Sequence, residues 1–146
     1  MKVEVWKKDE RAKLPERSTE GSVGYDIFAL EDLEILPGEF KLIRTGLVMK
    51  APYPYALLIF PRSSLFKNKG LIFPNSAGII DFDYCGADDE IKIPVVNITQ
   101  KAAFIKAHEK IAQAIFIQVG FPEIVEIKEP PQKTSRGGFG STGGYR

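Results

Sequence analysis

The residues best suited to chemistry include two aspartates in the segment Gly78–Gly86. Asp81 and Asp83 follow an apolar run with one residue between them. If the strand continues through them, one could act as a general base while the other has a structural role. The alternative interpretation is a turn built on aspartate side chains. A helix-flanked calcium loop does not fit, because its glycine and closing glutamate are not at the required positions.

A second segment with chemical potential is the glycine-rich tail from Ser135 to Arg146. Its successive glycines allow backbone N–H groups to approach an anion, Arg136 can bind phosphate bidentately, and Ser141 and Thr142 add hydroxyl donors. Phe139 offers a flat face for stacking on a base. The alternative is a disordered linker, which such a composition also favours. The tail is not a lysine-containing phosphate loop, because no lysine follows the glycines.

A third segment with chemical potential lies at the end of another predicted strand. It consists of Arg62, Ser63 and Ser64, which offer a guanidinium and two hydroxyls. This combination suits a phosphate chain. The structural interpretation is that Ser63 or Ser64 caps a short helix over Leu65–Asn68. Both interpretations can hold, since a helix N-terminus attracts anions.

Isolated polar residues also occur within apolar runs. Asp26 in a predicted strand indicates an edge or a bulge more often than a functional group, and Gln113 needs a hydrogen-bond partner if it is buried. His108 is interpreted as a solvated turn residue, and Asp88–Glu90 as a solvated acidic loop.

The elements that must position these residues are predicted to be short strands. Apolar runs separated by Gly, Pro, Asn and Asp predict a sandwich, barrel or jelly roll, with Trp6, Phe28 and Phe60 in its core. The predicted strands are Val3–Trp6, Gly24–Leu30, Phe40–Met49, Tyr55–Phe60, Leu71–Phe73, Ala77–Ile80, Ile91–Ile98, Ile111–Val119 and Ile124–Lys128. In Ala102–Phe116, apolar residues recur at helical spacing, so propensity alone leaves an amphipathic helix and a strand–turn–strand open.

Composition limits the class of protein. A chain of 146 residues with a net charge of +1 predicts one domain and shows no basic excess for nucleic-acid binding. The charged N-terminus is not a secretory signal, and no apolar run approaches the ~20 residues of a membrane helix. Cys85 is the single cysteine, so a reducing, cytoplasmic compartment is expected.

Taken together and in this order, five segments resemble the motifs of the trimeric dUTPases, and the match runs essentially end to end. The third and fifth are the most specific. The segments are Gly24–Ile27, Pro61–Leu65, Gly78–Tyr84, Lys110–Phe116 and Arg136–Gly143.

The resemblance implies an all-β, jelly-roll-like β barrel of the β-clip type, assembled as a homotrimer. Residues 1–128 would form the barrel domain, and residues 129–146 a mobile tail that closes over the active site of a neighbouring subunit. The family's fourth motif lies on a strand, so the resemblance favours strand–turn–strand, with the turn at residues 107–109, over helix.

The implied reaction is Mg²⁺-assisted hydrolysis of dUTP to dUMP and pyrophosphate, which lowers dUTP and supplies dUMP for thymidylate synthesis. Asp81 would activate the water that attacks the α-phosphorus, Tyr84 would pack on the deoxyribose, and Asp26 would reach the metal through water. The other implied catalytic residues are Arg62, Ser63 and Gln113. The other implied substrate contacts are Ser64, Asn75, Ile79, Ile80, Lys92, Arg136, Phe139, Gly140, Ser141 and Thr142.

The sequence departs from the family pattern at Ser64, at Cys85 and in Ala87–Asp89, which lengthen a hairpin. Two other functions stay open. One is a dCTP deaminase, alone or combined with dUTPase activity, because Arg62–Ser64 is similar to its turn. The other is a non-catalytic dUTPase-like binding module.

Overall fold

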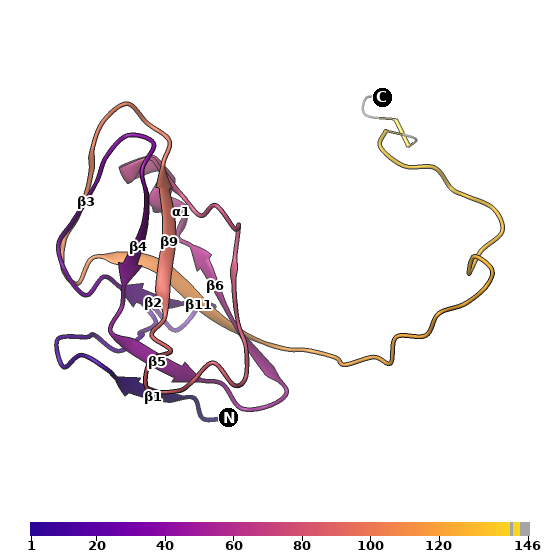
Figure 1. Cartoon of the computed structure of the whole chain (residues 1–146), viewed down its shortest axis with the longest axis horizontal. Helices are drawn as coiled ribbons and strands as arrows, with labels where there is room; N and C mark the ends of the chain where they lie inside the picture. Colours follow the sequence, from indigo (N-terminus) through magenta and orange to yellow (C-terminus); the bar gives the residue numbers. More distant parts are fainter. Residues whose placement is uncertain (141, 144–146) are drawn as a thin grey trace.

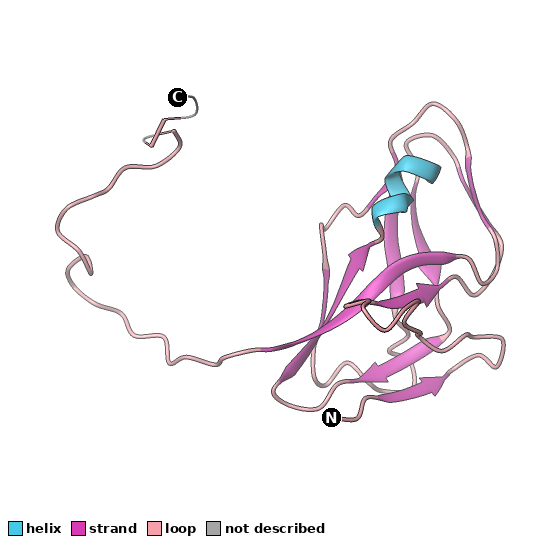
Figure 2. Cartoon of the chain, turned by 180° about the vertical axis from the view of Figure 1, so that it is seen from behind, coloured by secondary structure: helices cyan, strands magenta, loops and turns pink. Residues whose placement is uncertain are grey.

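The computed structural model describes residues 1–140 and 142–143, and short antiparallel strands dominate the body of the molecule (Figures 1 and 2). One short helix, α1 (Ser63–Lys69), is present in this part of the chain, and the mostly-β prediction is confirmed. The strands are β1 (Glu4–Lys7), β2 (Tyr25–Phe28), β3 (Leu33–Ile35), β4 (Phe40–Arg44), β5 (Leu47–Lys50), β6 (Tyr55–Pro61), β7 (Leu71–Ile72), β8 (Gly78–Ile80), β9 (Lys92–Asn97), β10 (Ala103–Ile105) and β11 (Lys110–Gln118).

The strands pair into four sheets, in the orders β2-β11-β6-β8, β4-β9-β7, β1-β5 and β10-β3. In the largest sheet, β11 lies between β2 and β6, so side chains of β11 have neighbours from two strands. Over the described residues, these sheets do not join into one closed barrel.

The core consists of aliphatic side chains that alternate along the strands. In β9, Ile93, Val95 and Asn97 are buried while Lys92 is exposed, as period-2 alternation requires. The buried amide of Asn97 donates to the backbone oxygens of Ile35 at 2.9 Å and Lys101 at 2.7 Å. Because its hydrogen bonds are satisfied, this polar group can lie in the core without a large desolvation cost.

The ambiguous segment is a strand–turn–strand, as the resemblance indicated. β10 pairs with β3 and β11 pairs with both β2 and β6, so tertiary hydrogen bonds override the helical spacing. His108 lies in the turn with φ of 65°, and its N–H donates to the carbonyl of Ala29 at 2.8 Å. The prediction of an exposed turn histidine is confirmed.

Two strand predictions differ from the structure. The predicted strand Phe40–Met49 is divided into β4 and β5, which belong to different sheets, because the chain bends at Gly46 with φ of 70°. A Cβ at Gly46 would also lie 2.9 Å from the Cβ of Ala12, so this bend requires glycine. The predicted strand Ile124–Lys128 does not form.

The core prediction is correct in part. Phe28 is buried and Phe60 is half-buried, but Trp6 is 52% exposed. Trp6 is adjacent to Val5 on β1, and because Val5 packs against the core, the side chain of Trp6 points to the opposite, exposed face.

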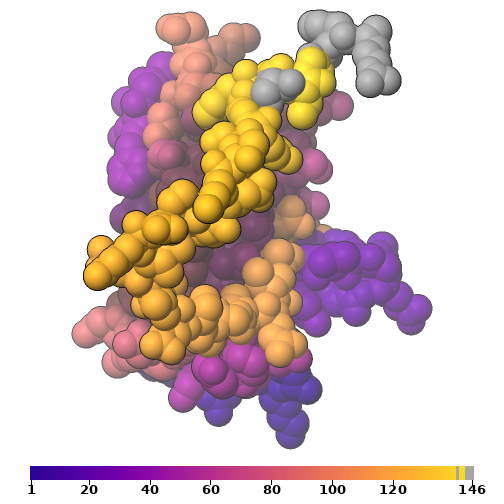
Figure 3. Space-filling model, turned by 90° about the vertical axis from the view of Figure 1, so that its right-hand side faces the viewer, coloured from indigo at the N-terminus to yellow at the C-terminus, as the bar shows by residue number. Residues whose placement is uncertain are grey.

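After Gln118 the chain leaves the body and extends away from it (Figures 1 and 2). The side view in Figure 3 faces the surface from which this extension projects. Apolar side chains such as Ile124 are exposed on this segment. No strand of the described chain pairs with it, so no strand forms there. Among the described residues, no helix is long and apolar enough to cross a membrane.

Candidate active site

One cluster of polar side chains follows directly from the register of β2, β11 and β6. Gln113 of β11 lies opposite Asp26 of β2 on one side and Phe60 of β6 on the other. Arg62 follows the last residue of β6 at the same end of the sheet. Residues distant in sequence therefore meet because β11 is the central strand.

The carboxylate of Asp26 is buried and held by two cations. Arg62 Nε lies 3.0 Å from one carboxylate oxygen, and Lys110 Nζ lies 2.8 Å from the other. The hydroxyl of Ser18 donates to the second oxygen at 2.5 Å. Asp26, Arg62, Lys110 and Ser18 are called the Asp26 cluster below. Its two cations exceed its single carboxylate, so it carries a net positive charge.

The protonation state of Asp26 follows from this geometry. Burial of the carboxyl tends to raise its pKa, but the hydrogen bonds from Lys110 and Ser18 and the charge of Arg62 more than offset that effect. The pKa of Asp26 therefore lies below the ordinary aspartate range, and the group is ionised at neutral pH.

A small cavity opens beside the Asp26 cluster. The Gln113 amide donates to the backbone oxygen of Pro61 at 3.0 Å, which orients the side chain. A Cβ at Gly24 would lie 2.6 Å from Gln113 Oε1, so a larger residue at this position would displace the Gln113 side chain. The cavity has a volume of about 280 Å³ and is lined by Ser18, Ser22, Val23, Gly24, Asp26, Arg62, Ser63 and Gln113. Its hydroxyls, amide and guanidinium suit an anionic ligand.

The serines after Arg62 do not cap the helix that follows them. Helix α1 begins at Ser63, Arg62 is its N-cap, and no side chain caps the helix, so the predicted serine cap is wrong. Ser63 lines the 280 Å³ cavity. Ser64 lines an adjacent hollow of about 240 Å³, together with Arg62 and Lys110. Both hydroxyls are therefore left for a ligand.

Asp81 lies in a second location, directly after the end of β8 at Ile80. The chain turns there, with the N–H of Tyr84 donating to the carbonyl of Asp81 at 3.2 Å. Asp81 and Asp83 thus occupy a turn, and the alternation expected of a continued strand does not apply. Asp81 is exposed, and within the described chain no side chain pairs with its carboxylate. The carboxylate is available to a water molecule.

The ring of Tyr84 is fixed by an interaction that the sequence did not reveal. Its hydroxyl donates to the backbone oxygen of Glu90 at 3.1 Å. The Glu90 side chain is buried and accepts hydrogen bonds from the N–H of Gly46 at 2.9 Å and from Arg44 Nε at 3.1 Å. The prediction of a solvated loop over Asp88–Glu90 is therefore wrong for Glu90, because its charge is paired.

The hairpin predicted around Ala87–Asp89 does not form, because β8 and β9 belong to different sheets. The segment is a loop, and Lys8, which follows β1, contacts it. Lys8 Nζ donates to the carbonyl of Ala87 at 2.8 Å and to the carboxylate of Asp88 at 2.9 Å. These contacts hold the loop that leads from Tyr84 to Glu90, although an exposed pair of this kind contributes little to stability.

The other residues predicted to contact a base surround β8. Ile79 and Ile80 belong to β8, and the side chain of Ile79 is exposed. Asn75 lies in the preceding loop, where its amide donates to the carbonyl of Ala77 at 3.1 Å. Lys92 is exposed at the start of β9. Asn75, Ile79, Ile80, Asp81 and Tyr84 are called the Asp81 side of the site below.

The structure does not bring the Asp81 side and the Asp26 cluster together within one chain. Ile80 lies opposite Leu57, near the start of β6, whereas Arg62 follows the end of that strand. Asp81 is then level with Ala56, six positions before Arg62, and at 3.3 Å per residue the separation is about 20 Å. A single copy therefore keeps these two groups of predicted site residues apart.

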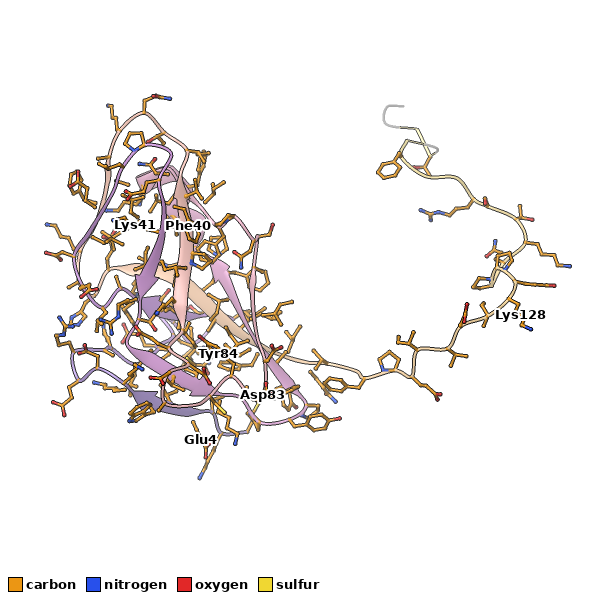
Figure 4. The ribbon with its side chains drawn as sticks, in the orientation of Figure 1. Glu4, Phe40, Lys41, Asp83, Tyr84 and Lys128 are labelled. Atoms are coloured by element: carbon orange, nitrogen blue, oxygen red, sulfur yellow. The ribbon has the colours of Figure 1, made fainter. Side chains whose placement is uncertain are left out.

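The tail residues Arg136, Phe139, Gly140 and Thr142 lie on the extended segment, exposed and away from both groups. The predicted contact at Ser141 lies outside the described residues. Figure 4 shows Lys128 on this segment and Asp83 and Tyr84 in the body, on the side from which the segment leaves.

Sequence reasoning missed Ser18, Lys110 and Glu90 as functional neighbours. The useful signal was Asp26, because an acid within an apolar strand requires a cation when it is buried. Its cations could not be chosen among the 20 lysines and arginines without knowledge of the strand register.

Comparison with known proteins identifies the family. The dUTPase family model matches residues 10–143. The chain belongs to the dUTPase family.

Individual proteins that are similar to this chain in sequence or in structure carry the same family name. A deoxyuridine 5′-triphosphate nucleotidohydrolase from Nautilia profundicola is 40% identical over 144 residues, covering 98% of this chain and 99% of that protein. The dUTPase of Staphylococcus bacteriophage 80alpha, solved with dUPNHPP, has a TM-score of 0.86 and 25% identity, covering 97% of this chain and 98% of that one. The predictions of the family and of the enzyme class are confirmed.

A third protein, a mutant dUTPase of phage phi11 of S. aureus, shares the fold, with a TM-score of 0.81 and 23% identity over 90% of this chain and 100% of that one. That structure is described as revealing how a structural Mg(II) ion is coordinated.

The charge of Asp26 predicts how stability depends on pH. Because the folded-state pKa is depressed, the stabilisation is present above the pKa of an unfolded aspartate, about 4, and is lost as pH falls through the folded value. Asp26→Asn should lower the free energy of unfolding by about 1–3 kcal/mol at pH 7, and the difference from the wild type should shrink below pH 4.

Urea unfolding at a series of pH values measures this difference, with Glu20→Gln, an exposed acid outside the cluster, as the control. A difference between wild type and Asp26→Asn that stays constant from pH 7 to pH 3 contradicts the assignment.

Proposed function

We propose that this dUTPase-family chain hydrolyses dUTP to dUMP and pyrophosphate through water activated by Asp81. The observation that carries the proposal is the exposed carboxylate of Asp81, which no side chain of the described chain neutralises, in a family motif next to β8. The relatives named deoxyuridine 5′-triphosphate nucleotidohydrolase, which match over nearly the whole chain, support the same substrate.

The active site is proposed to form between copies of the chain. Since about 20 Å separates Asp81 from Arg62 within one copy, a triphosphate cannot reach both unless another copy supplies one half. We propose a homotrimer of jelly-roll-like β barrels, in which one copy contributes the Asp81 side, a second the Asp26 cluster, and a third its tail. Residues 1–128 then form the barrel domain, and residues 129–146 the mobile tail.

Selection of the base is proposed to depend on the Asp81 side. Asn75 and the backbone of Ile79 and Ile80 would form the walls of a uracil slot, with Lys92 at its edge. Uracil and thymine differ by one methyl group, and a hydrophobic pocket discriminates one carbon by only ~1–3 kcal/mol. Rigid backbone walls reject thymine by steric exclusion instead, which a hydrogen-bonded strand can provide.

Selection of the sugar is proposed to depend on Tyr84. Its ring would pack against the deoxyribose and leave no room for a 2′-hydroxyl. The hydrogen bond from its hydroxyl to Glu90, together with the buried ion pair of Glu90 and Arg44, holds the ring in place. This rigidity makes exclusion of a ribonucleotide possible.

The phosphates are proposed to bind at the 280 Å³ cavity and its neighbour. Arg62, Ser63, Ser64 and Gln113 would donate hydrogen bonds to phosphate oxygens and stabilise the charge that develops during transfer. In the tail, Arg136, Phe139, Gly140 and Thr142 would close over the nucleotide and exclude bulk water.

The residues present fit Mg²⁺ only as an ion carried mainly by the substrate. Both oxygens of Asp26 already accept hydrogen bonds or ion pairs, and the described residues include no group of three metal-binding side chains. Phosphate oxygens and water would therefore supply most ligands, with Asp26 reached through water, which is a common arrangement for magnesium. When bound, the ion supplies neutralisation of phosphate charge.

In the proposed reaction, Asp81 accepts a proton from a water molecule whose oxygen attacks the α-phosphorus. The bond from this phosphorus to the bridging oxygen breaks, and pyrophosphate leaves with the electron pair. A positioned general base accelerates such a step by roughly 10²–10⁴-fold. In a cytoplasmic setting the reaction would lower dUTP and supply dUMP for thymidylate synthesis.

The central test replaces the base. Asp81→Asn keeps the shape of the side chain but cannot accept the proton, so kcat should fall by roughly 10²–10⁴-fold while dUTP still binds. Pyrophosphate release and calorimetric binding of a non-hydrolysable dUTP analogue measure the two effects. Asp83→Asn, two residues away in the same exposed turn, is the matched control and should retain most of its turnover. Equal turnover by wild type and Asp81→Asn would refute the assignment.

A truncation tests the tail. A chain that ends at Ser135 loses Arg136 and all residues after it, so kcat/KM for dUTP should fall by roughly 10²-fold or more. The thermal midpoint and the number of chains in the assembly should change little, because the described residues among those removed contact neither half of the site in the chain that carries them. Unchanged kinetics would rule out the closing role.

A further inference from the structure

Three aromatic rings meet where the chain enters β6. The ring centroids of Tyr53 and Phe121 lie 5.4 Å apart with planes at 19°, a stacked arrangement. Phe82 lies 5.6 Å from Tyr53 and 6.0 Å from Phe121, with tilted planes. Tyr53, Phe82 and Phe121 are called the aromatic cluster below.

The topology of the largest sheet explains why these rings meet. β6 lies between β8 and β11, with Ile80 opposite Leu57 and Gln118 opposite Tyr55. The loop before β6, the loop after β8 and the segment after β11 therefore converge at one end of the sheet. The N–H of Val119 donates to the carbonyl of Pro54 at 3.0 Å, which aligns the start of the tail with the loop before β6.

The aromatic cluster contributes little to the core. Tyr53 is 71% exposed and Phe121 is 60% exposed, so the rings remove little apolar area from water. Stacked and tilted ring pairs nevertheless have preferred geometries, so three mutually contacting rings restrict one another's positions. An exposed cluster of this kind is suited to orienting the segments that carry it.

One of those segments carries the proposed general base. Phe82 follows Asp81 directly, so a fixed Phe82 ring fixes the peptide that joins the two residues. The other end of the turn is held by Tyr84, through its hydroxyl and through its N–H bond to Asp81. The turn is therefore anchored on both sides of Asp83.

We propose that Tyr53, Phe82 and Phe121 are positioning residues that hold Asp81 in its reactive geometry and couple it to the root of the tail. This proposal rests on the function assigned to Asp81 above. Figure 4 shows the coupled elements on one side of the body: Asp83 and Tyr84 lie near the point from which the chain continues to Lys128.

The first measurement is steady-state hydrolysis of dUTP. Phe121→Ala and Phe82→Ala should lower kcat by roughly 10–100-fold, because a small displacement of a catalytic group has effects of this size, while KM changes little. Phe121→Tyr, which keeps the ring, should restore kcat. Phe104→Ala is the matched control, since Phe104 on β10 is 57% exposed and lies outside the cluster. Partial unfolding would also lower apparent kcat at constant KM, so kcat is expressed per folded molecule, with the folded fraction of each variant taken from circular dichroism.

The second measurement, hydrogen–deuterium exchange of the free protein, does not depend on activity. Phe121→Ala should accelerate exchange at the N–H of Tyr84, which bonds to Asp81, although the two positions are distant in sequence. Phe121→Tyr and Phe104→Ala should leave that exchange unchanged.

The two measurements separate the possible failures. If the wild type does not hydrolyse dUTP, the proposed function is wrong, and accelerated exchange in Phe121→Ala alone would support the coupling. If exchange around Tyr84 is unaffected by Phe121→Ala, the coupling is wrong whatever the activity. If exchange changes but kcat does not, the cluster does not position Asp81 and the proposal is overturned.

Discussion

The length of one strand, β6, is the constraint on which the rest of the structure depends. β6 is hydrogen-bonded to β8 on one side and β11 on the other. Its register with these strands therefore fixes where, along the direction of β6, the segments that follow β8 and β11 begin. Asp81 lies near its start and Arg62 after its end, about 20 Å apart at the rise of an extended chain. A strand in a paired sheet cannot shorten, so one copy cannot bring its own halves together. The proposed assembly meets this constraint because a second copy supplies the other half.

Two buried acids, Asp26 and Glu90, are each paired with an arginine and lie next to residues of the proposed site. Asp26 holds Arg62 and Lys110 beside the cavity, and Glu90 holds Arg44 while its backbone oxygen receives the hydroxyl of Tyr84. Such pairs cost desolvation energy, so their net contribution to stability is small compared with the penalty for breaking them. Their main effect is to orient the neighbouring side chains. Neither acid touches the bond that the proposed reaction breaks, yet each fixes a group that would touch the substrate.

Much of the fold could be predicted from the sequence, because period-2 alternation and turn residues mark most strands. The division of Phe40–Met49 into two strands could not, since it depends on contacts of Gly46 with residues outside the segment. The helical spacing in Ala102–Phe116 was misleading for the same reason: the pairing of β11 with two strands decided its conformation. Only the resemblance to a family favoured the correct alternative.

For the site, the sequence located the segments but not their partners. Motif order predicted roles for Asp26, Arg62, Gln113 and Asp81, which stay predictions, whereas the contacts of Lys110 and Glu90 required the register and the loop geometry. The spatial division of the site into two halves was also invisible in the sequence, because it follows from which strands are neighbours. The contacts of the tail remain proposals, since the described tail residues touch neither half.

The most direct measurement is pyrophosphate and nucleoside monophosphate release by the purified protein from dUTP, dTTP, dCTP and UTP, with and without Mg²⁺, with ammonia followed in parallel. We expect magnesium-dependent formation of dUMP and pyrophosphate from dUTP, slow reaction of the other three nucleotides, and no ammonia from dCTP. Intact dUTP in the presence of magnesium, or release of ammonia from dCTP, would contradict it.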